Sequence, residues 1–297
     1  MDPIRKELES KKVLVSDGAW GTFLAAKGMQ PGECPELWNL EHRDDVFDIA
    51  RSYAEAGADM VSTNTFGGSR FKLEHFGLAG RAAEINEVAA AISREAVGPG
   101  LRIFASVGPT GKILMMGDVT EEQLYDAFKE QVVALERGGA DACCIETMTA
   151  IDEATLAIRA AKDNTKLEVI STFSYDKMAD GSNRTMMGVS PAQAAAAALE
   201  AGADVIGANC GQGPDGLMDI VKELRAAAPD APILVQPNAG APVRQGDVDV
   251  FPETPESMAR YVPGLIDAGA NIIGGCCGNT PDHIRAIVTA VRQTIKQ

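Results

Sequence analysis

A four-residue motif that occurs four times constrains the fold of this chain more than any other feature. It reads Ala-Gly-Ala-Asp or a close variant, at residues 56–59, 138–141, 201–204 and 268–271. Each copy follows a helical pattern and precedes an apolar run, so its glycine is expected to end a helix just before a strand begins. Helix, tight turn and strand repeated in this way indicate βα units and a parallel sheet.

The apolar runs and the helical patterns between them both number eight. Strands are predicted at 13–16, 60–63, 103–107, 142–146, 168–172, 205–209, 233–236 and 271–274. Helices are predicted near 44–57, 80–97, 120–138, 151–163, 190–201, 214–228, 254–268 and 280–295. The alternation predicts an α/β fold, a single (β/α)₈ TIM barrel over residues 1–297. The alternative, an open doubly wound sheet, lacks an early Gly-x-Gly-x-x-Gly fingerprint here.

Charge and hydropathy exclude several functions. A formal net charge of −15 argues against nucleic acid and against an anionic membrane surface as a partner. No apolar run approaches the roughly 18 to 20 residues of a membrane-spanning helix, and the amino terminus lacks the apolar segment of a signal peptide. We therefore expect a cytoplasmic protein whose six cysteines are thiols or metal ligands rather than disulfides.

The long connections are those that run from strand to helix. They span 17–43, 108–119, 173–189 and 237–253, whereas the helix-to-strand turns are short. Long loops without structure of their own are usually functional, and in a barrel these loops gather at the carboxyl end of the strands. The active site is expected there.

Two adjacent cysteines lie at this end of the last predicted strand. Cys276 and Cys277 follow Gly274 and Gly275, and glycines that permit unusual backbone angles would let both sulfurs face one point. Cys210 ends the sixth strand at the same rim, and three thiolates around one barrel mouth suit zinc. A vicinal disulfide or plain buried thiols are the alternatives.

Three cysteine ligands leave one position of a tetrahedral zinc ion open. His42, His75 and His283 are expected at surface positions on loops or helices and offer no fourth ligand. An open position suits an external thiol, which the metal would hold as a nucleophilic thiolate. That chemistry is alkyl transfer to sulfur.

Five segments in chain order carry a resemblance to a known family. They are Asp17–Thr22, Thr63–Gly67, Gly207–Cys210, Gln236–Gly240 and Gly274–Gly278. Together they resemble the homocysteine S-methyltransferase family, which includes the homocysteine-binding module of cobalamin-dependent methionine synthase and betaine–homocysteine methyltransferase. The resemblance covers essentially the whole chain. It implies a zinc-bearing barrel that binds homocysteine through its sulfur, with Cys210, Cys276 and Cys277 as both the catalytic centre and the zinc ligands.

The resemblance also supports contacts to the amino-acid end of the substrate. Asp17 and Glu146 are expected to hold the ammonium group, and the backbone N–H groups of Gly18 and Ala19 to hold the carboxylate. A turn-forming role for Asp17 and a rim ion pair for Glu146 are the alternatives. The remaining expected contacts are Asn64 and Thr65, which would line the pocket or form a turn, and Asn238, which would approach the metal or brace a loop.

Other residues have less specific interpretations. Cys143 and Cys144 lie within a predicted strand and are expected to pack in the core. Cys34 is a peripheral thiol or part of a lid, and Trp20 is expected to shape access for the methyl donor. Exposed methionines at 115–116 and 186–187 would form a docking surface or pack locally.

These observations lead to one functional hypothesis with defined rivals. The protein is expected to be a zinc-dependent methyltransferase of methionine biosynthesis that converts homocysteine to methionine. The chain ends soon after the last predicted helix, so methylcobalamin would arrive on a separate corrinoid protein, although a fragment of a longer methionine synthase would look the same. The alternatives are S-methylmethionine or betaine as donor, another thiol as acceptor, a non-catalytic zinc- and thiol-binding subunit, and a disulfide switch at Cys276 and Cys277.

Overall fold

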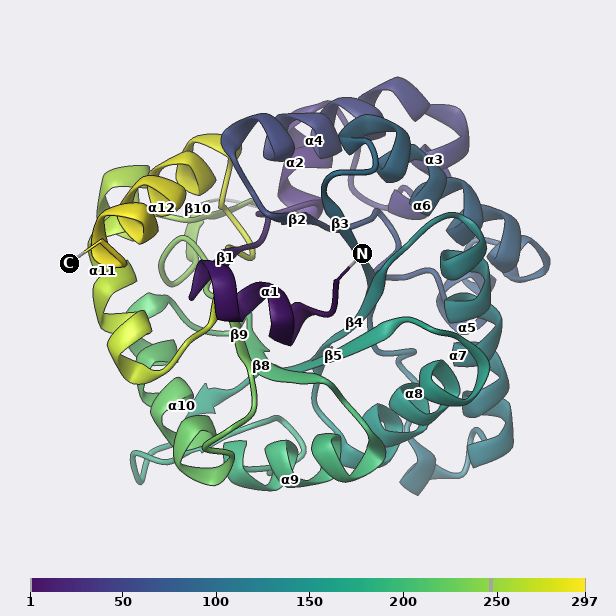
Figure 1. Ribbon diagram of the computed structural model, residues 1–297. Coiled ribbons are helices and arrows are strands. Elements are labelled where there is room, and N and C mark those ends of the chain that lie inside the picture. The colour runs from purple at the N-terminus through teal and green to yellow at the C-terminus, as the bar shows by residue number, and fades with distance from the viewer. Residues whose placement is uncertain (1, 246–247, 297) are drawn as a thin grey trace.

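The computed structural model describes residues 2–245 and 248–296, and its centre is a closed barrel of parallel strands (Figure 1). The barrel strands are β1 (Leu14–Val15), β2 (Met60–Val61), β3 (Arg102–Val107), β4 (Ala142–Met148), β5 (Glu168–Phe173), β8 (Val205–Asn209), β9 (Ile233–Gln236) and β12 (Ile272–Ile273). They are hydrogen-bonded in the order β1-β12-β9-β8-β5-β4-β3-β2, and a parallel bridge between Ser16 and Met60 joins the two ends. All eight predicted strands are therefore present, and the predicted TIM barrel is confirmed.

A ring of helices surrounds the strands (Figure 1). The eight predicted helices are α4 (Arg43–Ala56), α6 (Ala82–Val97), α7 (Glu121–Arg137), α8 (Ile151–Asn164), α9 (Pro191–Ala201), α10 (Pro214–Ala227), α11 (Pro255–Ala268) and α12 (Pro281–Thr294). The capping signals of the sequence act as expected: Thr120 and Ser190 each form a capping box at the start of α7 and α9.

Apolar side chains pack on both sides of the strands. A small cluster fills the barrel interior, with one or two residues from each strand, such as Phe104 from β3 and Leu234 from β9. A larger cluster lies between the strands and the helices. Cys144 belongs to the interior cluster and Cys143 to the outer one, so core packing of this pair is confirmed.

The acidic or amide residue that ends each repeated motif has a role that the sequence did not reveal. The carboxylate of Asp59 accepts a hydrogen bond from the backbone N–H of Val15 at 2.8 Å, on the neighbouring strand. Asp141, Asp204 and Asn271 make the equivalent contact to Ile103, Val169 and Ile233. Each motif thus ends a helix with its glycine and fixes the adjacent strand with its last side chain.

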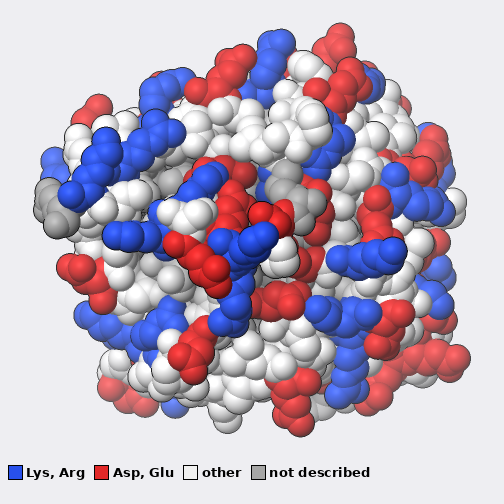
Figure 2. All heavy atoms as spheres, in the orientation of Figure 1, with Lys and Arg blue, Asp and Glu red and all other residues white. Residues whose placement is uncertain are grey.

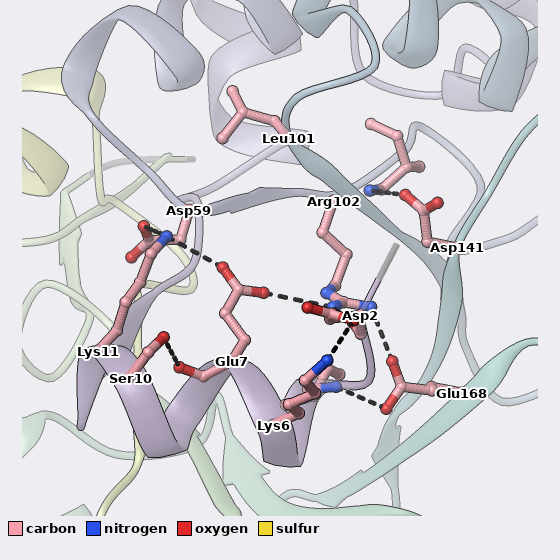
Figure 3. A network of polar contacts seen from close by, with 12 residues as sticks. Asp2, Lys6, Glu7, Ser10, Lys11, Asp59, Leu101, Arg102, Asp141 and Glu168 are labelled. Atoms are coloured by element: carbon pink, nitrogen blue, oxygen red, sulfur yellow. Dashed lines mark hydrogen bonds and ion pairs between the residues drawn. The ribbon is translucent and has the colours of Figure 1, made fainter.

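The amino-terminal end of the barrel is closed by α1 (Ile4–Lys11), which no sequence pattern predicted (Figure 1). Ile4 is fully buried and joins the interior cluster. Arg102 from β3 is only 2% exposed and pairs with Glu168 at 2.7 Å and with Glu7 of α1 at 3.3 Å (Figure 3). Around this plug, acidic and basic side chains are mixed over the face seen in Figure 2, so the described residues there form no separate basic surface.

The carboxyl-terminal end carries the long loops, and these contain more structure than expected. The loop after β1 contains α2 (Gly21–Ala26), the 3₁₀ helix η1 (Pro35–Leu37) and α3 (Trp38–Glu41). Short elements also occupy the other loops, namely α5 (Arg70–Glu74), η2 (Ala79–Arg81), η3 (Leu114–Met116) and the pairs β6 (Asp176–Lys177) with β7 (Asn183–Arg184) and β10 (Val243–Gln245) with β11 (Val248–Val250). The expectation of structureless loops was therefore wrong. Within the described residues, no helix combines the length and hydropathy needed to cross a membrane.

Candidate active site

The three cysteines singled out in the sequence meet at the carboxyl end of the barrel. Cys210 follows β8, and Cys276 and Cys277 follow β12, with β9 between these two strands. Their sulfur atoms all lie within 4.8 Å of one another. Sulfurs bound tetrahedrally to one zinc ion at about 2.3 Å lie roughly 3.8 Å apart, so a small adjustment would bring this cluster to the size of a metal site. All six cysteines of the chain are free thiols in this structure.

Close packing of the backbone brings the paired cysteines into position. A side chain at Gly274 would place its Cβ 1.9 Å from Oγ of Ser16, and one at Gly275 would meet Asn279 at 2.3 Å. Neither glycine has a positive φ, so the expectation of unusual backbone angles was wrong for this pair. Such an angle occurs instead at Cys210, with φ of 59°, a conformation that non-glycine residues rarely adopt.

The cluster has the donor chemistry that a soft cation requires. Hydrogen bonds from the thiols of Cys276 and Cys277 lower the pKa of Cys210 to about 3, while the same contacts raise the pKa of both donors. A coordinated cation would favour the thiolate form of all three sulfurs. Asn238 hydrogen-bonds to Cys210, and its Oδ1 is buried without a partner among the described residues. The residues present therefore fit a metal ion.

A cavity of about 350 Å³ opens beside the cluster. Cys210, Cys276 and Cys277 line it together with residues from the ends of β1, β2, β3 and β4. No lysine, arginine or histidine is among its described lining residues, whereas three carboxyl side chains are, those of Asp17, Glu36 and Glu146. This composition favours a ligand that carries a positive charge.

Asp17, at the end of β1, is the most constrained of these carboxyl groups. Its Oδ2 accepts hydrogen bonds from the indole Nε1 of Trp20 at 2.9 Å and from the N–H of Ser62 at 2.7 Å. Its Oδ1 is buried without a partner among the described residues. Burial raises its pKa to about 7. A cationic group of a ligand would supply the missing partner and favour the ionised form.

Glu146, near the end of β4, lies on the other side of the same cavity. It accepts a hydrogen bond from the hydroxyl of Ser106 on β3. Burial raises its pKa to about 7, and its charge contributes to raising the pKa of Asp17. No ion pair at the rim involves Glu146 in the described structure, so the alternative reading of this residue has no support.

Of the other predicted contacts, Gly18, Ala19, Asn64 and Thr65 line the cavity, whereas Asn238 does not. The Ala19 N–H donates to the carbonyl of Asn279 at 3.0 Å, so this N–H is not available to a ligand. Asn64 donates to the carbonyl of Pro35 at 2.6 Å, and Thr65 donates to the carbonyl of Ser106 at 2.7 Å. Asn64 and Thr65 thus form the wall of the cavity and brace it.

Three residues of the site escaped sequence analysis. Glu36 from η1 is buried and accepts a 2.6 Å hydrogen bond from the Gly67 N–H, which fastens the first long loop over the cavity. Tyr53 of α4 donates to the carbonyls of Ala19 and Asn279 and ties the β1 and β12 loops together. Asn209 precedes Cys210 and is fully buried. Of these three residues, only Asn209 had a signal in the sequence, since it stands next to a cysteine at the end of a predicted strand.

The prediction for His283 was wrong. This side chain is buried, 7% exposed, and its Nε2 lies 3.0 Å from the carbonyl of Glu253. It braces α12 against the loop before α11 and lies outside the cysteine cluster.

A larger and more open hollow of about 750 Å³ lies at the amino-terminal end of the barrel. Arg225, one of the basic residues that line it, donates to backbone carbonyls, including that of Ala231 at 2.8 Å, and to Asn271. The hollow contains none of the three clustered cysteines, so the cavity at the cysteines is the better candidate site.

The fold and the site define a (β/α)₈-barrel protein with a three-cysteine cluster that can hold a metal ion at its carboxyl-terminal face. The chain belongs to the homocysteine S-methyltransferase family, because the model of that family matches residues 14–291.

Comparison with individual proteins agrees with this family. The chain is 34% identical over 300 residues to the methionine synthase of Mycobacterium tuberculosis and 33% identical over 303 residues to that of Mycobacterium leprae. These alignments cover 95% and 96% of the chain but 25% of each relative, so the chain spans about a quarter of their length. The metallated form of the homocysteine methyltransferase MmuM from Escherichia coli has the same fold, with a TM-score of 0.78 at 21% identity over the full length of both chains.

Proposed function

We propose that this barrel transfers a methyl group to the thiol of homocysteine and so forms methionine. The observation that carries the proposal is the cavity that the thiol cluster shares with the buried carboxyl group of Asp17 and the partly buried one of Glu146, which matches a small ligand with a thiol at one end and an ammonium group at the other. Membership of the homocysteine S-methyltransferase family supports it. Residues 1–297 would act as a homocysteine-binding (β/α)₈ barrel domain.

Zinc is the proposed metal, held by Cys210, Cys276 and Cys277. Thiolate ligands favour zinc over the harder cations magnesium and calcium. When bound, zinc supplies a Lewis acid that keeps the substrate sulfur deprotonated near neutral pH. Asn238, with its unpartnered buried oxygen, would lie beside this centre.

The other residues of the cavity would orient the amino acid. Asp17 and Glu146 would bind the ammonium group, since both carboxyl groups line the cavity and a cation beside them would favour their ionised forms. The Gly18 N–H would bind the carboxylate, and Asn64 and Thr65 would shape the wall that faces the side chain. These contacts would hold the amino-acid end of the substrate while its sulfur lies at the cysteine cluster.

The reaction would then be a direct displacement. The sulfur forms a bond to the methyl carbon as the bond from that carbon to the donor breaks, and the electron pair leaves with the donor. The thiol proton is released when the substrate binds. The barrel contributes by holding the two reactants in line and by excluding water, which are effects worth several orders of magnitude in rate.

The proposed methyl donor is a methylcorrinoid carried by a separate protein, and S-methylmethionine and betaine are the alternatives. Trp20 and Phe66 line the cavity and would shape the donor's approach. To distinguish the donors, purified zinc-loaded protein is incubated with homocysteine and each donor in turn, and methionine is quantified. Methionine with one donor identifies it, and competition by other thiols in the same assay tests the acceptor. Homocysteine binding without turnover by any donor would contradict catalysis and indicate a thiol-binding subunit.

A further inference from the structure

Asn209, the residue before Cys210, contacts two neighbouring strands and the cysteine cluster. It is completely buried at the end of β8. Its Oδ1 accepts from the Thr147 N–H at 2.9 Å and from the Thr172 hydroxyl at 2.7 Å. Its Nδ2 donates to Oγ1 of Thr147 at 2.7 Å and makes a longer contact of 3.9 Å to the sulfur of Cys276. One amide therefore reaches β4, β5 and the cysteine cluster.

The contact to Thr147 falls on an irregularity in β4. The pairing of β4 with β5 shifts between Ile145 and Met148, where three steps along β4 match two steps along β5. This extra residue is a β-bulge, a feature that leaves a backbone N–H out of the ladder and redirects side chains. Thr147 has φ of 60°, a costly conformation for a β-branched residue. A strained residue of this kind persists only where its surroundings hold it.

The bulge determines which side chains face the cavity. In a regular strand, neighbouring side chains point to opposite faces. Here Glu146 and Thr147 are adjacent, and both line the cavity. Asn209 accepts the N–H of Thr147 that the bulge frees and also binds its hydroxyl, so it holds the bulge in a geometry that the strand alone would not keep.

We propose that Asn209 is a positioning residue that sets the distance between the two ends of the thiol substrate. Through Thr147 it fixes the Glu146 carboxyl, which receives the ammonium group, and through its own N–H it orients the sulfur of Cys276. The inference rests on the proposed function for the identity of the ligand. The bulge and the hydrogen bonds by which Asn209 holds it do not depend on which ligand binds.

Two substitutions separate these roles. Asn209→Ala removes every contact, so we expect the KM for homocysteine to rise at least about 10-fold and the metal affinity to fall roughly 10- to 100-fold, as for other groups that orient metal ligands. Asn209→Asp keeps both acceptor contacts that hold the bulge and replaces the N–H donor with a second carboxylate oxygen. The Thr147 hydroxyl can turn and donate to this oxygen, whereas the sulfur of Cys276 loses its donor. We expect this variant to keep a KM close to that of the wild type. Its cobalt-substituted form should show a shifted sulfur-to-metal charge-transfer band.

The matched control is Asn183→Ala, which removes another buried amide, one that donates to Glu223 at 2.8 Å outside the site. It should lower stability without changing the KM or the cobalt spectrum. If both Asn209 variants behave like this control while the wild type binds cobalt and homocysteine, the positioning role is wrong. A wild type that binds neither would instead refute the proposed function.

A crystal structure of metal-free Asn209→Ala tests, independently of any ligand, whether the hydrogen bonds of Asn209 hold the bulge. We expect Thr147 to leave its left-handed conformation and the Glu146 side chain to move. An unchanged bulge would overturn the inference, and Asn209→Ser serves if the alanine variant does not fold.

Discussion

The indole of Trp20 donates a 2.9 Å hydrogen bond to one oxygen of Asp17, and the other oxygen of that buried carboxyl group has no partner in the described structure. The bonded oxygen fixes the position of the carboxyl group, and the oxygen without a partner can accept a hydrogen bond from a ligand. It also carries a cost, because a buried ionised carboxyl group without a full set of partners is destabilising. Two of the predictions below follow from this arrangement.

Replacing Asp17 with Asn should weaken homocysteine binding by roughly 10- to 100-fold, because a charge-assisted hydrogen bond to the ammonium group is lost. The amide oxygen can still accept from Trp20 and Ser62, so the loop should stay in place. Isothermal titration with homocysteine measures the change. Zinc content should match that of the wild type, and the exposed substitution Glu55→Gln is the control for loss of one carboxylate. An unchanged affinity would show that Asp17 serves only the turn.

The stability of the metal-free protein should depend on pH through Asp17 and Glu146. Both have a pKa of about 7 in the folded protein, and ordinary values near 4 apply to the unfolded chain. Between about pH 4 and pH 7 the folded state binds more protons than the unfolded state. The free energy of unfolding should therefore fall as pH rises through this window. We therefore expect the free energy of unfolding of Glu146→Gln, relative to that of the wild type, to be higher at pH 8 than at pH 5. Urea unfolding at the two pH values measures it.

The same titration should act in the opposite direction on ligand binding. Homocysteine affinity should increase as pH rises through 7, because its ammonium group binds the ionised carboxylates. In Glu146→Gln the increase should be smaller. For the unfolding experiment, the contradicting outcome is a difference in free energy of unfolding between the wild type and Glu146→Gln that is the same at pH 5 and at pH 8. That outcome would contradict the assignment of these pKa values.

Replacing Cys277 with Ala should remove zinc while leaving the barrel folded. The side chain is one of three sulfurs that lie within 4.8 Å of one another, and two ligands hold the ion far less tightly than three. Affinity should fall by at least roughly 100-fold, more than for loss of an outer group that orients a ligand. Metal analysis and circular dichroism measure the two effects. Cys34→Ser is the control, since that thiol contacts Glu36 away from the cluster, and normal zinc content in Cys277→Ala would defeat the metal site.

Replacing Arg102 with Met should reduce stability but not substrate affinity. Arg102 is buried at the amino-terminal end, and its loss leaves the carboxylates of Glu168 and Glu7 without their partner. Removal of one member of a buried ion pair typically costs about 3 kcal/mol. Urea unfolding and homocysteine titration distinguish the two effects. Lys6→Met, which removes an exposed pair with Asp2, should change stability by less than about 1 kcal/mol. A raised Kd for homocysteine in Arg102→Met would show that the two ends of the barrel are coupled.

Much of the fold was visible in the sequence because it depends on local patterns. The helix-ending glycines of the repeats, Gly57, Gly202 and Gly269, adopt left-handed conformations that their positions predicted. Apolar runs of strand length and the capping residues Thr120 and Ser190 act within a few residues of the chain. Cys210 and the cysteine pair could be placed at one rim as soon as the barrel was inferred, since all strands of a parallel barrel end on the same side.

The sequence failed where distant segments meet. The α1 plug depends on Ile4 and Arg102, which are far apart in the chain. His283 is buried because α12 packs against the end of the 237–253 loop, a contact that no sequence pattern predicts. The raised pKa values of Asp17 and Glu146 result from burial, which local polarity does not reveal.

The sequence by itself thus determined the order and the kind of the elements and the end of the barrel at which chemistry could occur. Only the tertiary structure decided which side chains share the cavity, because that depends on how the strands close and on the bulge at Thr147. Periodicity reports on forces between residues a few positions apart. The approach of Asn209 to β4 and to Cys276 depends on packing between segments that only the closed barrel brings together.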